Sequence, residues 1–338
     1  MSAGHDTQPG ANHGTEPGAS DDTRADAGDE LRDLIADIAA THTEPPAGEL
    51  PSCWPVLVEL GLPLVGIDEA RGGSGGSVAD LVVLARALGR HAISTPLIET
   101  SVASWVVASA CGEVGPGLRT ITAGPLDSVG WARHADQLVL YRDGGAWLAD
   151  TGAPGIEIEP GTNVADEPCD DVRLPGSALA RLGSAPTAED ARARLGVLRA
   201  AALTGAVEGA YELTRGYVST REQFGRPLVR IPAVAANLAI IKTSVILCDA
   251  ALTRACGGTL AAVAAARIIA GRAATQTARI AHQLHGAIGV TSEYRLHLFT
   301  KRLWAWRDAE TTEHDWSVLL GEMAAAGGEP AFWDELTA

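Results

Sequence analysis

Apolar residues recur at helical spacing over the first third of the chain. Residues 30–38 place large apolar side chains at the i, i+3, i+4 and i+7 positions of one helix face. Residues 78–88 form a second segment of this kind, and Gly89, which follows it, is typical of a C-terminal helix cap. We therefore expect helices throughout residues 29–110.

The pattern changes after residue 115. Short runs that alternate or are rich in β-branched residues begin at residues 118, 137 and 155, and Gly, Pro or Asp-Gly separates them. Beyond Thr187, long Ala-rich segments of helical period return, and Thr187 with the acids behind it is a typical N-terminal helix cap. The helices expected there span about residues 190–219, 231–255, 259–285 and 293–325.

These segments predict an α+β fold that is mostly α. Its parts are an N-terminal helical domain, a small central β domain and a C-terminal four-helix bundle. The expected boundaries are residues 29–115, 116–185 and 186–326 for these three parts, with an N-terminal tail at 1–28 and a C-terminal tail at 327–338.

Composition and charge narrow the possible functions. Of 338 residues, 46% are hydrophobic and 20% are charged, as in soluble globular proteins. The net charge is −16, and the acidic tail at residues 1–28 is rich in Gly, Ser, Asp and Thr, which predicts disorder. Because no basic stripe is present, we expect no nucleic-acid partner.

The tail lacks the features of a secretory signal, and Arg or Lys interrupts the long apolar runs, so we expect a cytoplasmic protein without a membrane span.

The cysteines and histidines give no sign of a metal or redox centre. The five cysteines are scattered and none forms a C-x-x-C pair, which is typical of reduced thiols. Cys248 and Cys256 are expected on one face of one core helix. His282 and His285 have a spacing that could ligate a metal, but no carboxylate or third histidine lies beside them in the sequence. We expect no metal site.

Polar residues interrupt the apolar bundle at two places. The first is Arg221-Glu-Gln223-Phe224-Gly, and the second is Gln283-Leu-His-Gly286. A guanidinium fork suits a pyrophosphate, amide side chains suit a heterocycle or a ribose edge, and glycine lets the backbone approach a ligand. Although Arg221 and Gln223 alone would fit a solvated helix end, the two motifs together favour contact with a cofactor.

These motifs resemble those of the acyl-CoA dehydrogenase family, whose C-terminal helical domain carries R-x-Q-F-G and Q-x-H-G-G. In this chain Ala287 replaces the last glycine of the second motif. Other segments similar to the family, in the same order, are Glu59-Leu-Gly-Leu62, Gly72-Gly-Ser-Gly75, Ala87-Leu-Gly-Arg90 and Gly289-Val-Thr-Ser-Glu-Tyr294. The resemblance covers roughly residues 50–110 and 190–320, and the joint order makes it specific.

The resemblance implies an FAD-dependent enzyme that introduces an α,β double bond into an acyl-CoA thioester and passes the electrons to an electron-transfer acceptor. It implies that Arg221 meets the FAD pyrophosphate, that Gln223 and Phe224 pack on the adenosine half, and that Gln283 with Gly286 closes over it. In the family these residues reach the flavin of a neighbouring subunit. Where the family usually has Phe-Gln, this chain has Ile-Pro at residues 231–232, so one flavin-facing amide is missing.

The resemblance also implies a catalytic base. In many members a Glu in Y-E-G-T lies at a fixed interval past the Q-x-H-G-G glutamine, and counting 27 residues from Gln283 reaches Glu310. Thr312 then matches the threonine that contacts the flavin, whereas the Tyr and Gly are replaced. Alternatively, Glu310 is one of several acids on an exposed turn. The family's second location for the base falls near Arg194, where no carboxylate is present.

The central segment departs from the family. Catalytically complete members carry a longer β domain with a T-E-P-x-x-G-S-D-like loop at the flavin ring, and no such loop occurs between residues 115 and 185. Three hypotheses remain. The chain is the smaller partner of a heteromer that shares an FAD site and acts on a bulky acyl-CoA such as a steroid side chain. It is a self-sufficient homo-oligomeric dehydrogenase with Glu310 as base. Or it is a non-enzymatic assembly subunit.

Overall fold

The computed structural model describes residues 19–328, 330 and 333–334. The N-terminal tail expected at residues 1–28 therefore lies mostly outside the described residues, as does most of the C-terminal tail. Residues 19–28, expected to be disordered, belong to helix α1 (Ala19–Thr41), so this part of the prediction was wrong. Helical periodicity identified only the second half of α1, because its first half is acidic and nearly lacks large apolar residues.

The N-terminal part is helical, as predicted. It contains α1, α2 (Trp54–Glu59), α3 (Val78–Arg90) and α4 (Leu97–Cys111). Gly89 is not the cap that we expected, because α3 continues to Arg90. A Cβ at Gly89 would lie 2.1 Å from the carbonyl oxygen of Ala202, so this glycine lets α3 pack closely against a helix of the C-terminal bundle.

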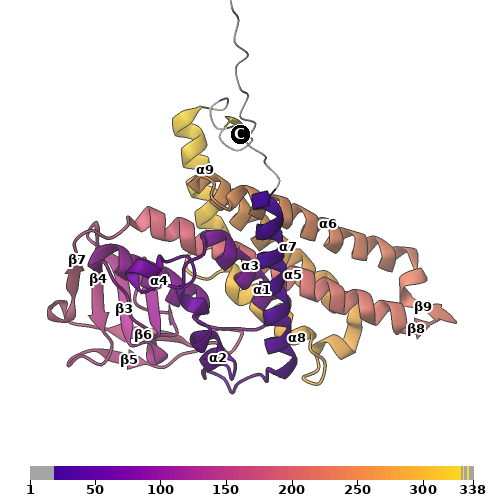
Figure 1. The fold of residues 1–338 in the computed structure, drawn as a ribbon. Coiled ribbons are helices and arrows are strands. Elements are labelled where there is room, and N and C mark those ends of the chain that lie inside the picture. The colour runs from indigo at the N-terminus through magenta and orange to yellow at the C-terminus, as the bar shows by residue number, and fades with distance from the viewer. Residues whose placement is uncertain (1–18, 329, 331–332, 335–338) are drawn as a thin grey trace, which may run out of the picture.

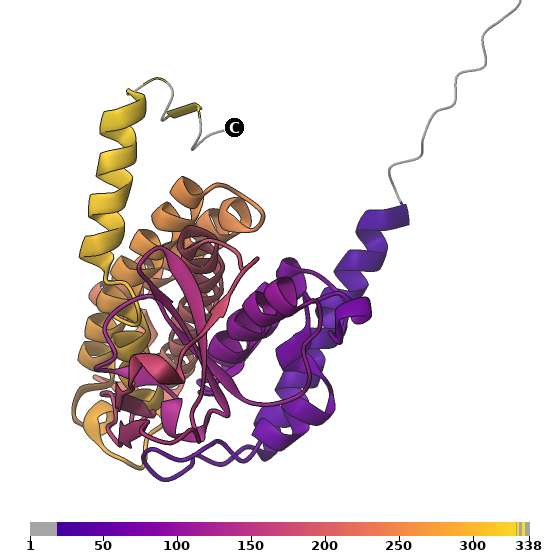
Figure 2. The same cartoon turned by 90° about the vertical axis from the view of Figure 1, so that its left-hand side faces the viewer.

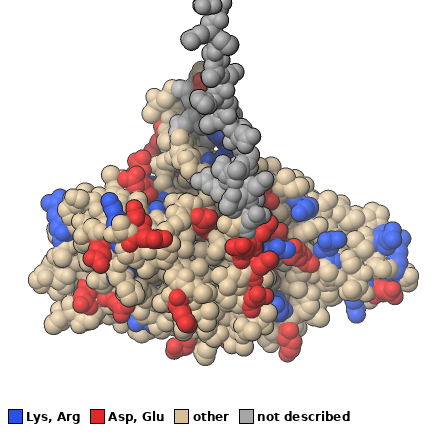
Figure 3. All heavy atoms as spheres, viewed as in Figure 1, with Lys and Arg blue, Asp and Glu red and all other residues tan. Residues whose placement is uncertain are grey.

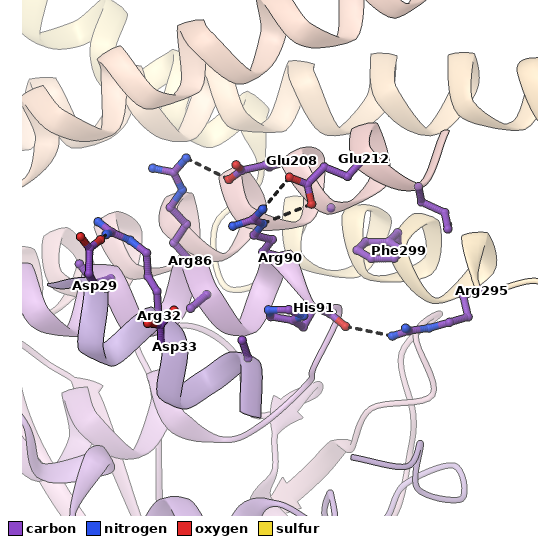
Figure 4. A pocket seen from close by; sticks show the side chains of 15 residues that line it. Asp29, Arg32, Asp33, Arg86, Arg90, His91, Glu208, Glu212, Arg295 and Phe299 are labelled. Carbon is purple, nitrogen blue, oxygen red and sulfur yellow. Dashed lines mark hydrogen bonds and ion pairs between the residues drawn. The ribbon is translucent and has the colours of Figure 1, made fainter. Parts of the chain in front are cut away.

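Charged side chains reinforce this contact between α3 and helix α5 (Ala188–Thr220). Arg86 Nη2 lies 3.0 Å from Glu208 Oε2, and Arg90 binds both carboxylate oxygens of Glu212 (Figure 4). The two pairs repeat at the i, i+4 spacing of both helices. They line a cavity of about 890 Å³ between α1, α3, α5 and α8 (Leu296–Arg307). Because its acidic and basic residues largely neutralise one another, we read this cavity as part of the helix packing.

The middle of the chain is a small β domain. One sheet has the order β1 (Arg119–Thr122), β3 (Gln137–Arg142), β4 (Gly145–Asp150) and β7 (Ala180–Leu182), with β1 parallel to β3. A second sheet contains β2 (Val129–Gly130), β6 (Cys169–Arg173) and β5 (Glu157–Glu159). The sequence had indicated only β1, β3 and β5. The other strands are short or carry small and charged residues.

The C-terminal part is a helix bundle. It is formed by α5, α6 (Pro232–Ala255), α7 (Leu260–His285), α8 (Leu296–Arg307) and α9 (Glu313–Gly327). The expected fourth helix is thus two helices, and the break between them contains Glu310. Cys256 lies just beyond the end of α6 rather than on one helix with Cys248.

One helix of the bundle is unusually apolar. Among the described residues, α6 is long and apolar enough to cross a membrane by length and composition, although Lys242, Asp249 and Arg254 interrupt its apolar run as predicted. One face of α6 is buried in the bundle, through residues such as Leu238, Ile241 and Val245. Its other face is exposed and includes Ile246 and Leu247.

The β domain and the far end of the bundle lie on opposite sides of the molecule (Figures 1 and 2). Between them, α3 and α4 pack against α5, and one hydrophobic core extends through the N-terminal helices, the inner strands and the bundle. The architecture of N-terminal helices, small β domain and C-terminal helix bundle confirms the predicted fold class.

Candidate functional site

Three of the predicted cofactor-binding residues lie on a short hairpin after α5. Its strands are β8 (Glu222–Gln223) and β9 (Arg226–Pro227), and the two turn residues, Phe224 and Gly225, have φ values of 53° and 74°. Positive φ at both positions is what a tight two-residue hairpin requires. Phe224 is 88% exposed. No side-chain hydrogen bond or ion pair to Arg221 or Gln223 occurs within the described residues, so both are free to bind a ligand or a partner.

Gln283 and Gly286 lie at the same end of the bundle. Gly286, which ends α7, has φ 62° and ψ −141°, a conformation that essentially only glycine adopts. His285 fixes this helix end, because its buried ring stacks on Tyr217 at 4.5 Å and its Nε2 lies 3.3 Å from the Tyr294 hydroxyl. Tyr217 belongs to the last turn of α5, one turn before Arg221. The structure therefore brings the two polar motifs to one end of the bundle.

The hairpin end is basic although the chain is acidic. Arg215, Arg221, Arg226 and Arg230 are exposed there, and Lys and Arg side chains gather at this end in the space-filling view (Figure 3). Such a cluster suits phosphate groups, which guanidinium groups bind through charge and paired hydrogen bonds.

Glu310 occupies a different place, at the break between α8 and α9. It has a positive φ of 56°. Its carboxylate accepts two hydrogen bonds from the Arg199 guanidinium, one of them from Nε at 3.3 Å. Arg199 Nη2 also donates to Glu99 Oε1 at 2.7 Å. Glu310 is thus neither an unpaired base nor a fully exposed turn residue, but one member of a carboxylate–guanidinium–carboxylate triad, named here the Glu99–Arg199–Glu310 triad.

Burial shapes the electrostatics of this triad. Burial raises the pKa of Glu99, the charge of Arg199 opposes this shift and the charge of Glu310 adds to it. For Arg199, burial alone would lower the pKa, but the charges of Glu310 and Glu99 outweigh it and raise the pKa above its ordinary value. The triad therefore keeps a guanidinium ion in the protein interior.

A second buried arginine supports the Glu310 segment. Arg267 on α7 donates hydrogen bonds of 3.2–3.4 Å to the carbonyl oxygens of Trp306, Arg307, Ala309 and Thr311. The carbonyls of Trp306 and Arg307 end α8, and those of Ala309 and Thr311 lie in the break before α9. Burial lowers the pKa of Arg267 to about 10. The position of Glu310 is thus fixed from two helices.

Thr312 acts as a helix cap in this structure. Its hydroxyl accepts a hydrogen bond from the Asp315 amide and donates to the Asp315 carboxylate, which forms a capping box at the start of α9. Its predicted role at a flavin stays a prediction.

A cavity of about 680 Å³ lies between the β domain and α8, beside the triad. Glu99, Arg199 and Glu310 line it, and so do Trp131 and Trp306. Glu99 and Arg199 were not predicted from the sequence, because they lie about 100 or more residues from their ion-pair partners. No local sequence motif identifies these two residues.

The two groups of predicted residues lie far apart within the chain. Arg199 lies within α5, and Arg221 is the C-terminal cap of the same helix. The 22 residues between them, at a rise of 1.5 Å each, separate their Cα atoms by roughly 33 Å. One bound cofactor in this chain would have to span that length to touch Arg221 and lie beside Glu310. The structure does not bring the base candidate and the hairpin motifs into one site.

Among the described residues, no group of His, Cys, Asp or Glu side chains is arranged to hold a metal ion. The two candidate histidines are engaged elsewhere. His282 Nε2 lies 3.0 Å from the Thr300 hydroxyl, and His285 Nδ1 lies 2.8 Å from the Ala281 carbonyl oxygen.

Comparisons with known proteins agree with this architecture. Residues 19–115 match the family model "Acyl-CoA dehydrogenase, N-terminal domain", and residues 191–313 match "Acyl-CoA dehydrogenase, C-terminal domain". The chain is similar to acyl-CoA dehydrogenase IpdE2 of Mycobacterium tuberculosis, with 29% identity over 80% of this chain and 89% of that protein. It is also similar to acyl-CoA dehydrogenase FadE28 of the same organism, with 27% identity over 73% of this chain and 84% of that protein.

Two solved structures share the fold. The Tcur3481–Tcur3483 steroid ACAD G363A variant has a TM-score of 0.81 and 23% identity, over 91% of this chain and 99% of that chain. The ChsE4–ChsE5 complex from Mycobacterium tuberculosis has a TM-score of 0.76 and 20% identity, over 88% of this chain and 97% of that chain. With both terminal domains matched and the fold shared, the chain belongs to the acyl-CoA dehydrogenase family.

Proposed function

We propose that this chain is the smaller subunit of a heteromeric acyl-CoA dehydrogenase. In this proposal it contributes half of an FAD site whose flavin ring and catalytic base belong to a second, related subunit. Arg221, Gln223, Phe224, Gln283 and Gly286 form the contribution of this chain. When bound, FAD accepts the hydride that leaves the β-carbon of the acyl thioester.

The observation that carries this proposal is that a buried arginine holds the candidate base, Glu310, away from the cofactor motifs. The cofactor motifs lie roughly 33 Å along α5 from Arg199, while Glu310 is bound to Arg199. A carboxylate that abstracts a proton becomes neutral, and here that would remove one of two counter-charges from a buried guanidinium. Glu310 is therefore poorly suited to be a base while Arg199 holds it.

The residues at the hairpin fit the diphosphate half of FAD. The Arg221 side chain has no hydrogen-bond or ion-pair partner among the described residues, and three further arginines lie at the same end of an otherwise acidic chain. By contrast, the carboxylates of Glu99 and Glu310 make the cavity beside the triad a poor place for a diphosphate. In the proposed assembly the hairpin holds the diphosphate of a flavin seated in the partner.

Exposed apolar side chains support the need for a partner. Phe224 on the hairpin, Ile288 and Val290 after α7, and Ile246 and Leu247 on α6 are all exposed. Exposed apolar side chains that gather in patches commonly mark interfaces. An interface here accounts for the exposed face of α6 without a membrane.

The substrate that we propose is a bulky acyl-CoA thioester, such as one with a steroid side chain. One of the structural neighbours is described as a steroid ACAD, and both neighbours are two-protein assemblies by their names. We further propose that the assembly works in the cytoplasm and passes its electrons to a separate electron-transfer acceptor.

The test is complementation between subunits. This chain and a candidate partner acyl-CoA dehydrogenase from the same organism would be purified separately and assayed for α,β-desaturation of a steroid side-chain acyl-CoA, alone and mixed. We expect activity only in the mixture, and an Arg221→Ala chain should complement poorly. Full activity of this chain alone would overturn the proposal.

The alternative is a self-sufficient dehydrogenase with Glu310 as base. Two observations favour it: Glu310 lines the cavity beside the β domain, and it lies 27 residues after Gln283, as in the family. This alternative requires Arg199 to release Glu310 when substrate binds. It predicts that Glu310→Gln abolishes desaturation, whereas the heteromer proposal predicts little effect. The assembly-only alternative predicts no bound flavin in any mixture.

A further inference from the structure

The hairpin that follows Arg221 is too small to hold itself in place. Its strands β8 and β9 contain two residues each, and the hairpin projects from the end of the bundle (Figure 1). An isolated two-stranded hairpin is marginally stable at best in water. A guanidinium that meets a diphosphate must nevertheless be held in a defined geometry by the residues around it. The position of Arg221 must therefore come from the structure behind the hairpin.

Three aromatic rings pack against one another behind Arg221, and we name them the Tyr217–His285–Tyr294 cluster. The ring of His285 stacks on that of Tyr217, with centroids 4.5 Å apart, and its centroid lies 5.0 Å from that of Tyr294. The two tyrosine rings meet edge to face at 5.8 Å. The three residues belong to α5, to α7 and to the segment before α8. The cluster thus joins three elements at the hairpin end of the bundle.

Hydrogen bonds fix which nitrogen of His285 carries the proton. Nδ1 lies 2.8 Å from the Ala281 carbonyl oxygen, which can only accept, so Nδ1 is the donor. Burial lowers the pKa of His285, so its ring is neutral near pH 7 and Nε2 is an acceptor. The Tyr294 hydroxyl, 3.3 Å from Nε2, therefore donates to it. His285 is bonded on both edges of its ring, to its own helix and to the segment before α8.

The cluster is connected to Arg221 through Tyr217. The Tyr217 hydroxyl donates to the His285 carbonyl oxygen at 3.4 Å, and the Tyr217 carbonyl oxygen accepts from the Arg221 amide at 2.8 Å. The Arg221 carbonyl oxygen accepts from the Leu228 amide at 2.8 Å, which closes the base of the hairpin. Tyr217 and Leu228 pack on a small hydrophobic core that is separate from the main core. The hairpin end of the bundle is therefore a packing unit of its own.

We propose that the Tyr217–His285–Tyr294 cluster consists of positioning residues, which hold Arg221 in register with Gln283 so that one bound FAD meets both motifs. This inference rests on the proposed function, and it assigns the three rings no contact with the flavin. Its consequence is that the loss of the Tyr294 hydroxyl is transmitted to Arg221 through His285 and Tyr217.

Amide hydrogen exchange in the full-length chain tests this connection without any flavin. Tyr294→Phe removes one hydroxyl and keeps the ring. We expect it to speed exchange of the Arg221 and Leu228 amides about twofold to tenfold, the effect of one lost neutral hydrogen bond, while amides of the main core keep their rates. The matched control is Tyr141→Phe, which removes a hydroxyl that donates to the Pro186 carbonyl oxygen at 2.9 Å. This control should leave the hairpin amides unchanged.

A double-mutant cycle shows whether the effect passes through the His285 ring. In His285→Asn the ring and its Nε2 are absent. Adding Tyr294→Phe should then have no further effect on hairpin exchange, because the partner of the hydroxyl is already lost. Additive effects of the two substitutions would contradict the inference. If His285→Asn folds poorly, Tyr294→Phe alone remains a valid test, because it keeps every ring in place.

Flavin retention tests the positioning role itself. The chain would be assembled with a candidate partner acyl-CoA dehydrogenase from the same organism, and release of FAD would be followed on dilution. We expect Tyr294→Phe to speed release about twofold to tenfold, and Tyr141→Phe to leave it unchanged.

Arg221→Ala in the same assay separates this inference from the proposed function. If Arg221→Ala speeds release of FAD and Tyr294→Phe does not, the cluster does not position the site and the proposed function stands. If Arg221→Ala changes nothing, the proposed function fails and this inference fails with it. Unchanged hairpin exchange in Tyr294→Phe would overturn the inference alone.

Discussion

The Glu99–Arg199–Glu310 triad predicts a specific loss of stability when its cation is removed. The Arg199 and Glu99 side chains are each 7% exposed, and that of Glu310 is 27% exposed. In Arg199→Met an apolar side chain of similar reach replaces the guanidinium and leaves Glu99 without a counter-charge. Removal of one partner from a buried pair typically costs about 3–5 kcal/mol, so we expect a loss of this size in the free energy of unfolding near neutral pH.

The loss should depend on pH. Burial raises the pKa of Glu99 in the folded protein, and without Arg199 its pKa should be higher still. The folded state then binds more protons than the unfolded state, so stability falls as pH rises through the folded pKa of Glu99. The deficit of Arg199→Met should therefore be larger at pH 8 than at pH 5.

Urea unfolding of wild type and variant at both pH values measures this deficit. The control is Glu310→Gln, which keeps the bond between Arg199 and Glu99 and removes only the more exposed carboxylate. Its cost should be smaller, about 1–2 kcal/mol. A loss below about 1 kcal/mol for Arg199→Met, or a loss that is the same at both pH values, would refute the view that Arg199 neutralises buried carboxylates.

Three further predictions concern single residues. In the assembled enzyme, Glu310→Gln should leave kcat within about twofold of wild type, whereas loss of a true base would cost about 10²- to 10⁴-fold. Arg221→Ala should weaken FAD retention by the assembly about tenfold or more, as measured by flavin release on dilution, without changing the unfolding midpoint of the isolated chain. Gly89→Ala should destabilise the chain by about 1–3 kcal/mol in urea unfolding, because its Cβ would lie 2.1 Å from a carbonyl oxygen. Gly216→Ala, on α5 with open space around it, is the control and should be neutral or stabilising.

The architecture could be predicted because it rests on local patterns. Apolar periodicity indicated the helical ends of the chain and the β-rich middle, and short motifs indicated the family. The break between α8 and α9 also had a local signal that we did not use, since Thr312 and Asp315 have the spacing of a capping box. Gly89 was misassigned because close packing against α5, rather than helix termination, requires a glycine there.

The surroundings of Glu310 could not be predicted in this way. Its partner Arg199 lies 111 residues away in the sequence, and Arg199 meets Glu99 across another 100 residues. Such contacts depend on how three helices pack, and single-sequence periodicity carries no information about that. The roles of Arg221, Gln223 and Gln283 at a flavin stay predictions, because their ligand would lie outside the chain's own core.

The central claim, that this chain supplies half of a shared flavin site, is tested most directly by the visible absorbance spectrum. The chain would be purified alone and again after co-expression with a candidate partner acyl-CoA dehydrogenase from the same organism. We predict a colourless protein alone and a flavin spectrum in the complex. One FAD bound per chain in the protein purified alone would contradict the account.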